Sequence, residues 1–299
     1  MNTQMDGTKL DGGTIMPAHW IQRFIWFVAF LASGLLVFVV FGHYFPTFKG
    51  TADTIGRVFV AAAFLVMAII ARQREGLRKH WLIPFAFFTA LTAISIDYTL
   101  GLSKWILPAL GLSIKSPAGL AIDKLESSLL GIVTVLTLNG LAGQGVDSLY
   151  IRRGNLKLGL IVGLLAFGLM AAFVIPVTEW FFKGENLTWA RILPWMPWVL
   201  IMVFSNAAYE ELVFRGLFIG KMSPFLGRFA INLVTTIPFV LNHAGNNYMS
   251  NAFIFFVLQL LPLSLVWCWL MQKTSSLWGS ILFHAAMDIP VFVGIFSTL

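Results

Sequence analysis

Charged side chains are scarce in this chain, because Asp, Glu, Lys and Arg make up only 11% of its 299 residues. A soluble domain carries roughly 25% of these four residue types, so the composition excludes an ordinary water-soluble fold. Hydrophobic residues account for 58% of the sequence, and the mean hydropathy is +0.84. The composition therefore predicts a polytopic membrane protein.

Cysteine is almost absent as well, and the single Cys268 lies within an apolar run. One cysteine excludes an intramolecular disulfide framework and a cysteine-based metal site, so we expect Cys268 to be a small packing residue. The first apolar run, residues 20–42, is too long for a signal-peptide core and lacks an A-x-A cleavage site. We expect the preceding polar leader, residues 1–16, to be solvated and disordered.

Long apolar runs divide the rest of the chain. Such runs are too continuous for the alternating strands of a membrane barrel, which need about 10 residues each. Helices are the other structure that satisfies backbone hydrogen bonds in lipid. We therefore expect an all-α fold, a polytopic transmembrane helix bundle of eight or nine spans. The count depends on two runs, because 55–71 is short and 119–143 begins with charged residues. The runs lie at 20–42, 55–71, 81–101, 119–143, 158–178, 194–219, 229–247, 252–271 and 276–297.

Basic residues cluster in two short loops, Arg72–Lys79 and Arg152–Lys157, and the net charge is +7. The positive-inside rule places both loops in the cytoplasm. With nine spans, the N-terminus is then cytoplasmic and the C-terminus lies outside. Nucleic acid is not expected as a partner, because no soluble domain presents these loops. Oligomeric state is left open.

The position of polar residues divides the chain further. Before about residue 150 the charges collect at span ends and in loops, whereas later spans hold histidines and asparagines within them. We expect a polar leader at 1–19, variable N-terminal spans at 20–150, and a core at 151–299 where chemistry takes place. No internal repeat or matching pair of broken helices suggests a transporter.

Two adjacent carboxylates, Glu210 and Glu211, lie in a run that is otherwise apolar apart from Arg215. On a helix, Glu211 and Arg215 are four residues apart and can form an ion pair. Glu210 points about 100° away and has no cation on its own helix. A carboxylate left unpaired at bilayer depth is a usable general base. The alternative is that both acids form a structural clasp with Arg215.

Two further pairs have the same four-residue spacing. Phe239 and His243 lie one helical turn apart in a long uncharged run, so the phenyl ring can pack against the imidazole and fix its orientation. His284 and Asp288 share a face of the last span, where the carboxylate could orient the imidazole or share a metal or water with it. Three spans thus contribute titratable groups, which are expected to converge because lipid does not solvate them.

Together these motifs resemble those of a known family. In order and spacing, Glu210-Glu211-x-x-x-Arg215, Phe239-x-x-x-His243 and His284-x-x-x-Asp288 are similar to the motifs of the CAAX-protease and bacteriocin-processing (CPBP, or Abi) intramembrane endopeptidases. The Rce1-type CAAX prenyl endopeptidases are their eukaryotic relatives. The resemblance covers roughly residues 155–299.

The resemblance implies an enzyme that hydrolyses a peptide bond of a membrane-associated protein or peptide. It implies that Glu210 activates water, that His243 positions this water, and that His284 and Asp288 hold the oxyanion. Glu211, Arg215 and Phe239 match positions of structural support. The expected partners are membrane lipid and the peptide substrate, and the expected location is a bacterial cytoplasmic membrane, which the chain crosses several times.

Zinc is an alternative, because Glu210, His243, His284 and Asp288 are ligand types that zinc accepts. The sequence lacks H-E-x-x-H, and a metal bound by Glu210 would leave no separate base. The resemblance implies a metal-free, glutamate-dependent mechanism, so we expect no cofactor. A second alternative is a non-proteolytic membrane protein, either a proton-coupled transporter or a bacteriocin-immunity-type factor, since such proteins also bury Glu, His and Asp.

Overall fold

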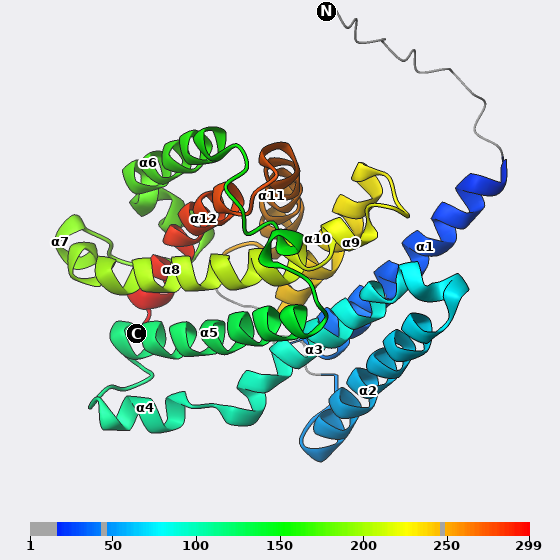
Figure 1. Ribbon diagram of the computed structural model, residues 1–299. Helices are drawn as coiled ribbons and strands as arrows, with labels where there is room; N and C mark the ends of the chain where they lie inside the picture. The colour runs from blue at the N-terminus through cyan, green and yellow to red at the C-terminus, as the bar shows by residue number, and fades with distance from the viewer. Residues whose placement is uncertain (1–16, 43–46, 246–248) are drawn as a thin grey trace, which may run out of the picture.

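A computed structural model describes residues 17–42, 47–245 and 249–299 of the chain. The expected leader lies mostly outside these residues. The described part is an all-α bundle without strands, which confirms the predicted fold class (Figure 1). The α-helices are α1 (Pro17–Leu35), α2 (Thr51–Gln73), α3 (Leu82–Leu100), α4 (Ser103–Ala109), α5 (Pro117–Leu141), α6 (Leu156–Phe181), α7 (Trp189–Ile192), α8 (Met196–Glu211), α9 (Ile219–Met222), α10 (Arg228–Asn242), α11 (Leu261–Thr274) and α12 (Trp278–Ser297).

The expected count of eight or nine spans is wrong by the criteria of length and composition. Among the described residues, seven helical segments are long and apolar enough to cross a membrane. Helix α10 has 15 residues, or about 22 Å at 1.5 Å per residue, which is shorter than the bilayer core. Helix α5 is long enough, but Asp123, Lys124 and Glu126 lie in its first half. The seven segments are Trp20–Val40, Thr51–Gln73, Leu82–Leu100, Leu156–Phe181, Trp189–Met222, Ile254–Thr274 and Trp278–Ser297.

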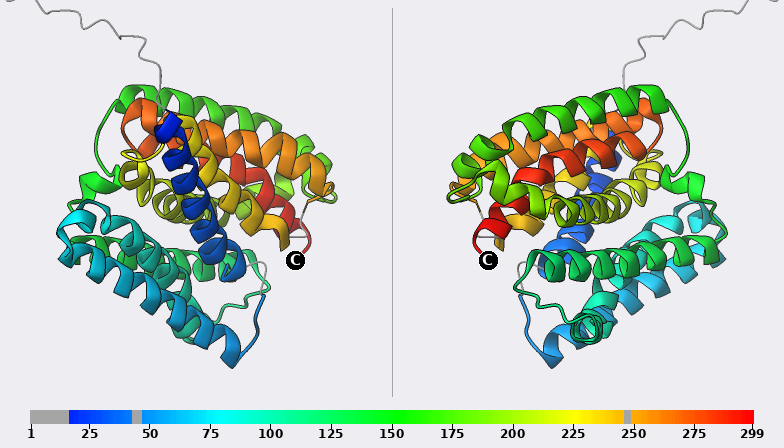
Figure 2. Two further views of the ribbon diagram at one scale, coloured as in Figure 1. Left: turned by 90° about the vertical axis from the view of Figure 1, so that its right-hand side faces the viewer. Right: turned by 90° about the vertical axis from the view of Figure 1, so that its left-hand side faces the viewer.

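Helix α12 lies at the centre of the C-terminal half, packed between α6 and α8 (Figure 2). Within its apolar window 61% of the residues are buried, against 22% for α6. Two glycines permit the close approach of α6 and α12, because a Cβ on Gly159 would lie 3.0 Å from the Cα of Gly279. Small residues of this kind let membrane helices pack backbone to backbone. The last helix is therefore held at a fixed depth in the bundle.

Three π-helical segments widen the helices that surround the bundle's interior: η1 (Leu36–Val40), η5 (Leu212–Gly216) and η7 (Ile254–Leu260). Segment η5 follows α8 directly, immediately after the two adjacent carboxylates. Single-turn π-helices inside α-helices occur frequently at functional sites. The chain stays helical through η5, so Glu211 and Arg215 keep a common face.

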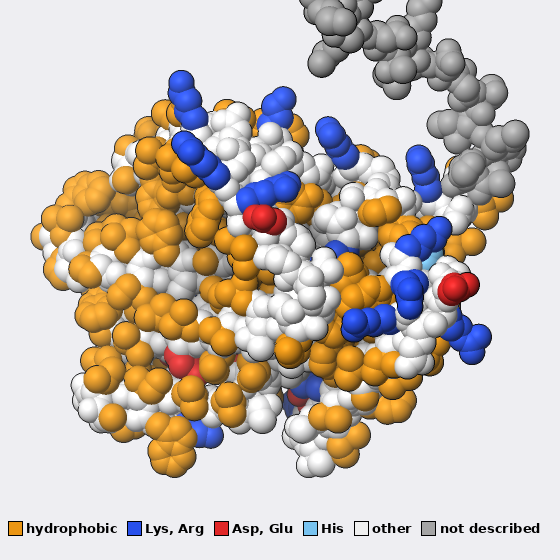
Figure 3. Space-filling model, in the orientation of Figure 1, with side chains coloured by type: hydrophobic (Ala, Val, Ile, Leu, Met, Phe, Trp, Pro, Cys, Tyr) orange, Lys and Arg blue, Asp and Glu red, His pale blue; other side chains and the backbone are white. Residues whose placement is uncertain are grey.

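The loops that carry or adjoin the second basic cluster meet at one end of the bundle. Leu277 donates a backbone hydrogen bond to Tyr150 (3.0 Å), and Arg152 Nε donates to the carbonyl of Ser275 (2.8 Å). Lys and Arg side chains gather along the upper and right margins of the molecule, and hydrophobic side chains cover much of the rest of that face (Figure 3). The cytoplasmic N-terminus and the division at residue 150 stay predictions.

His80 joins the N-terminal helices to the C-terminal half in an aromatic cluster. Its ring lies 5.4 Å from that of Trp26 and 4.8 Å from that of Phe225, centroid to centroid. Partial burial, and secondarily the charge of Lys79, hold the pKa of His80 below its ordinary value of 6.5. The folded protein therefore favours the neutral ring.

We expect this cluster to make stability depend on pH. Above pH 6.5 the ring is neutral in both folded and unfolded protein, so its contribution is fully present. As the pH falls below 6.5, the unfolded chain takes up a proton that the folded chain resists, and the free energy of unfolding decreases. The measurement is the thermal unfolding midpoint in detergent at pH 7.5 and 5.5. His80→Phe should show a smaller decrease, and an equal decrease in both proteins would contradict the assignment.

Candidate active site

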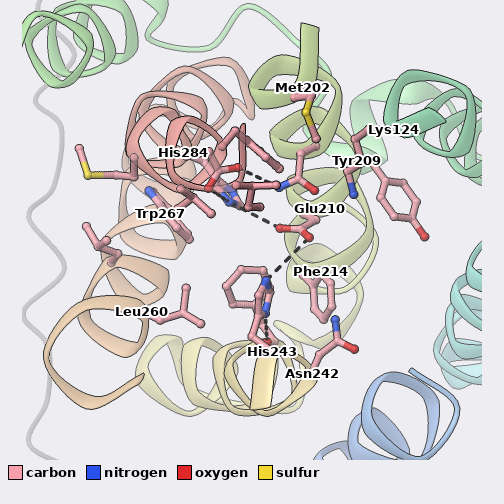
Figure 4. A pocket seen from close by; sticks show the side chains of 18 of the residues that line it. Lys124, Met202, Tyr209, Glu210, Phe214, Asn242, His243, Leu260, Trp267 and His284 are labelled. Atoms are coloured by element: carbon pink, nitrogen blue, oxygen red, sulfur yellow. Dashed lines mark hydrogen bonds and ion pairs between the residues drawn. The ribbon is translucent and has the colours of Figure 1, made fainter. Parts of the chain in front are cut away.

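All four predicted catalytic residues line a single cavity of about 530 Å³. Glu210 comes from the end of α8, His243 from the turn that follows α10, and His284 and Asp288 from α12. The side chains of Glu210, His243 and His284 point toward one another in the close view (Figure 4). The volume lies within the range of small-molecule and cofactor sites. The structure thus brings together residues that are up to 78 positions apart, from Glu210 to Asp288.

Glu210 lies between two imidazoles. Its Oε1 is 4.0 Å from Nε2 of His243, and its Oε2 is 3.5 Å from Nε2 of His284. Both separations exceed the usual length of an N–H···O hydrogen bond. The carboxylate is therefore adjacent to both rings without a close contact to either, an arrangement suited to a water molecule or a reacting group between them.

The neighbouring Glu211 forms the predicted ion pair with Arg215, with Oε1 2.9 Å from Nη1. The same oxygen is 2.8 Å from Nδ1 of His284 and accepts its N–H. Glu211 and Arg215 are completely buried. Sequence reasoning missed the contact with His284, because it paired Glu211 with Arg215 alone. A carboxylate on Nδ1 fixes the orientation of the imidazole and turns Nε2 toward the cavity.

Arg215 extends this contact to two more helices. Its Nη2 donates to the hydroxyl of Ser264 on α11 (2.6 Å), which in turn donates to Thr236 on α10 (3.0 Å). Its guanidinium carbon lies 4.3 Å from the centre of the Phe239 ring, a cation–π contact. Phe239 therefore packs at the site as the resemblance implied, between Arg215 and the imidazole of His243.

The ring of His284 is also fixed from one face. The indole of Trp267 stacks on it with 3.9 Å between centroids and 10° between planes. Phe239 meets His284 edge to face at 6.0 Å. Trp267 was missed by the sequence reasoning, because one of eleven tryptophans in an apolar span carries no signal of its position.

Asp288 is held by a residue that sequence reasoning also missed. Asn206 donates from Nδ2 to Oδ2 of Asp288 at 2.8 Å, whereas Oδ1 of Asp288 lies 3.6 Å from Nε2 of His284. The hydrogen bond that orients His284 thus comes from Glu211 and not from Asp288. A signal for Asn206 was present, since it precedes Glu210 by four residues in an apolar helix and shares its face.

His243 is oriented by its own helix. Its Nδ1 lies 2.8 Å from the backbone carbonyl of Phe239, one turn earlier. Donation to this carbonyl leaves Nε2, the nitrogen closer to Glu210, as the acceptor. The phenyl ring of Phe239 lies 4.7 Å from the imidazole, centroid to centroid. The two histidines consequently differ in environment, one held by a carbonyl and the other by a carboxylate.

In the part of the chain that the structure describes, no three His, Cys, Asp or Glu side chains are grouped as ligands of a metal ion. The zinc set considered from the sequence was Glu210, His243, His284 and Asp288. Glu211, outside that set, makes the direct hydrogen bond to His284. Zinc therefore stays an alternative that requires its own measurement.

Removing the charge of Glu211 should destabilise the protein strongly. Glu211→Gln leaves Arg215 as a buried charge without its carboxylate, a change that costs about 3–5 kcal/mol. The measurement is the thermal unfolding midpoint in detergent. Glu210→Gln, the same change one residue earlier, is the matched control and should shift the midpoint much less. Equal midpoints for the two variants would contradict the supporting role of Glu211.

A comparison with known protein families finds one family that resembles part of the chain. Residues 192–290 match the family model described as type II CAAX prenyl endopeptidase Rce1-like. The matched segment contains all three motifs, whereas no curated protein and no solved structure matches the chain. The match confirms the resemblance drawn from the motifs. With seven apolar helices long enough to cross a membrane, the chain is an integral membrane protein. Its residues 192–290 are similar to the Rce1-like CAAX prenyl endopeptidases, a family of CAAX-type intramembrane proteases.

Proposed function

We propose that this protein is a glutamate-dependent intramembrane endopeptidase that hydrolyses a peptide bond of a membrane-associated protein or peptide. The observation that carries the proposal is the position of Glu210. Its carboxylate lies between Nε2 of His243 and Nε2 of His284, at 4.0 and 3.5 Å, and faces a cavity of about 530 Å³. Such a group is a candidate general base by geometry.

In this mechanism Glu210 removes a proton from water while Nε2 of His243 accepts the second hydrogen of that water and orients it. The hydroxide attacks the carbonyl carbon of the substrate, and the carbonyl oxygen becomes an oxyanion. Collapse of this intermediate breaks the C–N bond, and Glu210 returns its proton to the leaving amine. The products are a carboxylic acid and an amine.

His284 donates to the oxyanion in this proposal, and Asp288 orients the groups that hold it. Nδ1 of His284 is occupied by Glu211 at 2.8 Å, so a protonated ring presents Nε2–H to the cavity. The 2.8 Å hydrogen bond from Asn206 to Asp288 fixes the position of the Asp288 carboxylate beside His284. Preorganised donors of this kind account for roughly 10²–10³ in rate in characterised enzymes.

The hydrophobic outer surface of the protein supports a membrane-associated substrate. Exposed hydrophobic side chains cover the spanning helices, for example Phe59 on α2 and Leu165 on α6. Membrane lipid is the proposed partner of this surface, in a bacterial cytoplasmic membrane with the N-terminus in the cytoplasm. Nucleic acid is not a proposed partner.

Replacement of Glu210 tests the proposal directly. Glu210→Gln keeps the size of the side chain and removes the base, so we expect kcat/KM to fall by about 10²–10⁴. The assay measures cleavage of a fluorogenic membrane peptide in proteoliposomes. Glu179→Gln, at an exposed position of α6, is the matched control and should retain activity.

Two outcomes would overturn the assignment. Unchanged hydrolysis in Glu210→Gln would remove the base from this residue. Proton-coupled uptake into liposomes that disappears in the same variant, with no hydrolysis by the wild type, would favour a transporter.

Zinc is tested on the same preparation. We expect hydrolysis to persist after treatment with a chelator, and elemental analysis to find zinc far below one atom per chain. Loss of activity on chelation that is restored by added zinc would instead assign Glu210, His243, His284 and Asp288 to a metal centre.

A further inference from the structure

The helices of the bundle connect at two opposite ends, and both basic loops lie at one of them. These loops are Arg72–Lys79 and Arg152–Lys157, and we call their end of the bundle the basic end. The ring of His80, which follows the first loop, lies 4.8 Å from that of Phe225, just after α9. Helix α9 in turn packs beside Tyr150, just before the second loop. The two loops therefore belong to one face of the protein.

The opposite end, which we call the distal end, carries the end of α12. There the backbone N–H of Ser250 donates to the carbonyl of Phe181 at the end of α6 (2.8 Å). Arg191 donates to the carbonyl of Ser297 at the end of α12 (3.0 Å). In both views of Figure 2 the C-terminus lies at one end of the bundle and the loop between α5 and α6 lies at the other.

Positive charge differs between the two ends. In the helix connections and at the helix ends, the basic end carries twice as many Lys and Arg side chains as the distal end. By the positive-inside rule this bias predicts that the basic end faces the cytoplasm and the distal end faces the other side of the membrane. The basic end has Arg72, Arg74, Arg78, Lys79, Arg152, Arg153, Lys157, Lys221, Arg228 and Lys273, and the distal end has Lys49, Lys104, Lys115, Lys183 and Arg191.

The cavity extends from the catalytic residues toward the distal end. Its lining residues in α3 lie within 93–97, close to the distal end of that helix, and those in α5 lie within 120–127, in the first half of a helix that starts at the distal end. In α6 they lie within 170–181, and in α12 they continue from 284 to 295, two residues before the helix ends. Four helices thus turn their distal halves to the cavity.

The path from the site to the basic end is filled with side chains. Arg215, Leu217, Ile219 and Met222 follow Glu210 along the chain in that direction, and each is at most 2% exposed. Close packing of this kind leaves no passage for a peptide. A peptide held in the cytoplasm would therefore meet a closed surface of the protein.

Two carboxylates mark the distal part of the cavity. Asp97 and Asp123 line it and are partly exposed, and Asp97 lies three residues before the end of α3. Charged side chains within membrane proteins face a partner or a water-filled cavity, because lipid does not solvate them. Hydrolysis consumes one water molecule for each bond that is broken, so this polar stretch is suited to supply it.

We propose that water and substrate reach Glu210 from the non-cytoplasmic side of the membrane, and that the substrates are peptide segments exposed on that side, such as exported peptides. The inference rests on the proposed peptidase function, to which it adds the location of the substrate. The distal extent of the cavity and the closed basic end carry it, and the charge bias assigns the side.

Cysteine labelling tests the direction of the cavity without any assay of activity. Cys268 is the one cysteine of the chain and is buried, so Cys268→Ser gives a background without reactive thiols. Single cysteines are then placed at Ser127 in the cavity wall, at exposed Lys115 just before α5, and at exposed Arg153 in the second basic loop. The probe is a membrane-impermeant maleimide, applied to intact cells and to inverted membrane vesicles.

We expect Ser127→Cys and Lys115→Cys to be labelled in intact cells, and Arg153→Cys to be labelled only in inverted vesicles. Labelling of Arg153→Cys in intact cells would overturn the assigned side. Labelling of Ser127→Cys from inverted vesicles alone, or from neither side, would overturn the distal opening.

A second measurement asks from which side a peptide is cleaved. A peptide with a charged tag is added outside right-side-out vesicles and outside inverted vesicles that contain equal amounts of the wild-type protein. Because the tag prevents crossing of the bilayer, the initial rate should be at least about tenfold higher in right-side-out vesicles. A higher rate in inverted vesicles, or equal rates, would contradict the inference. Absence of hydrolysis in both preparations and in detergent would defeat the peptidase assignment, whereas the labelling result would still decide the direction of the cavity.

Discussion

The rest of the structure depends on one buried carboxylate, that of Glu211. Its Oε1 contacts both Nη1 of Arg215 and Nδ1 of His284, and through Arg215 the network continues to Ser264 and Thr236. Four helical elements, α8 with η5, α10, α11 and α12, are therefore joined by an ion pair and hydrogen bonds as well as by apolar packing. A buried ion pair is weak evidence for stability in itself. Its partners are strongly coupled, however, because removal of one leaves the other as an unpaired buried charge. Register among these helices is thus tied to the position of His284.

That coupling explains why two adjacent acids serve different purposes. A step of about 100° along a helix separates neighbouring side chains, so Glu211 points into the protein while Glu210 points into the cavity. Arg215 neutralises the first and lies on its face of the helix. The carboxylate of Glu210 lies 4.0 Å from the imidazole of His243 and 3.5 Å from that of His284. The carboxylate that holds the site together and the carboxylate proposed to act on water are thereby kept apart within a single turn.

Sequence reasoning reached contacts along a helix and missed most contacts between helices. The ion pair of Glu211 with Arg215 follows from a spacing of four residues, and so does the approach of Phe239 to His243. Trp267 on His284 depends on how α11 packs against α12, which no periodicity encodes. The expected span count was too high because residues 119–143 and 229–247 were counted as spans, whereas α5 carries Asp123 and Lys124 on the wall of the cavity and α10 has 15 residues. Charged side chains that face the cavity lower the mean hydropathy of α5, just as the charged residues of a loop would.

Two of the helices that line the cavity, α6 and α12, contain irregular stretches. Helix α6 departs from helical geometry at Phe173 (φ −110°, ψ 15°), three residues before Pro176, and α12 contains Pro290. Kinks in helices commonly arise at proline, where a backbone hydrogen bond is lost. The hydroxyl of Thr178 on α6 donates to the carbonyl of Pro290 on α12 (3.2 Å), so the two irregular stretches are in direct contact. The polar wall of the cavity is thus fixed by Glu211 and Arg215, and the contact between the irregular stretches of α6 and α12 supports the neighbouring wall.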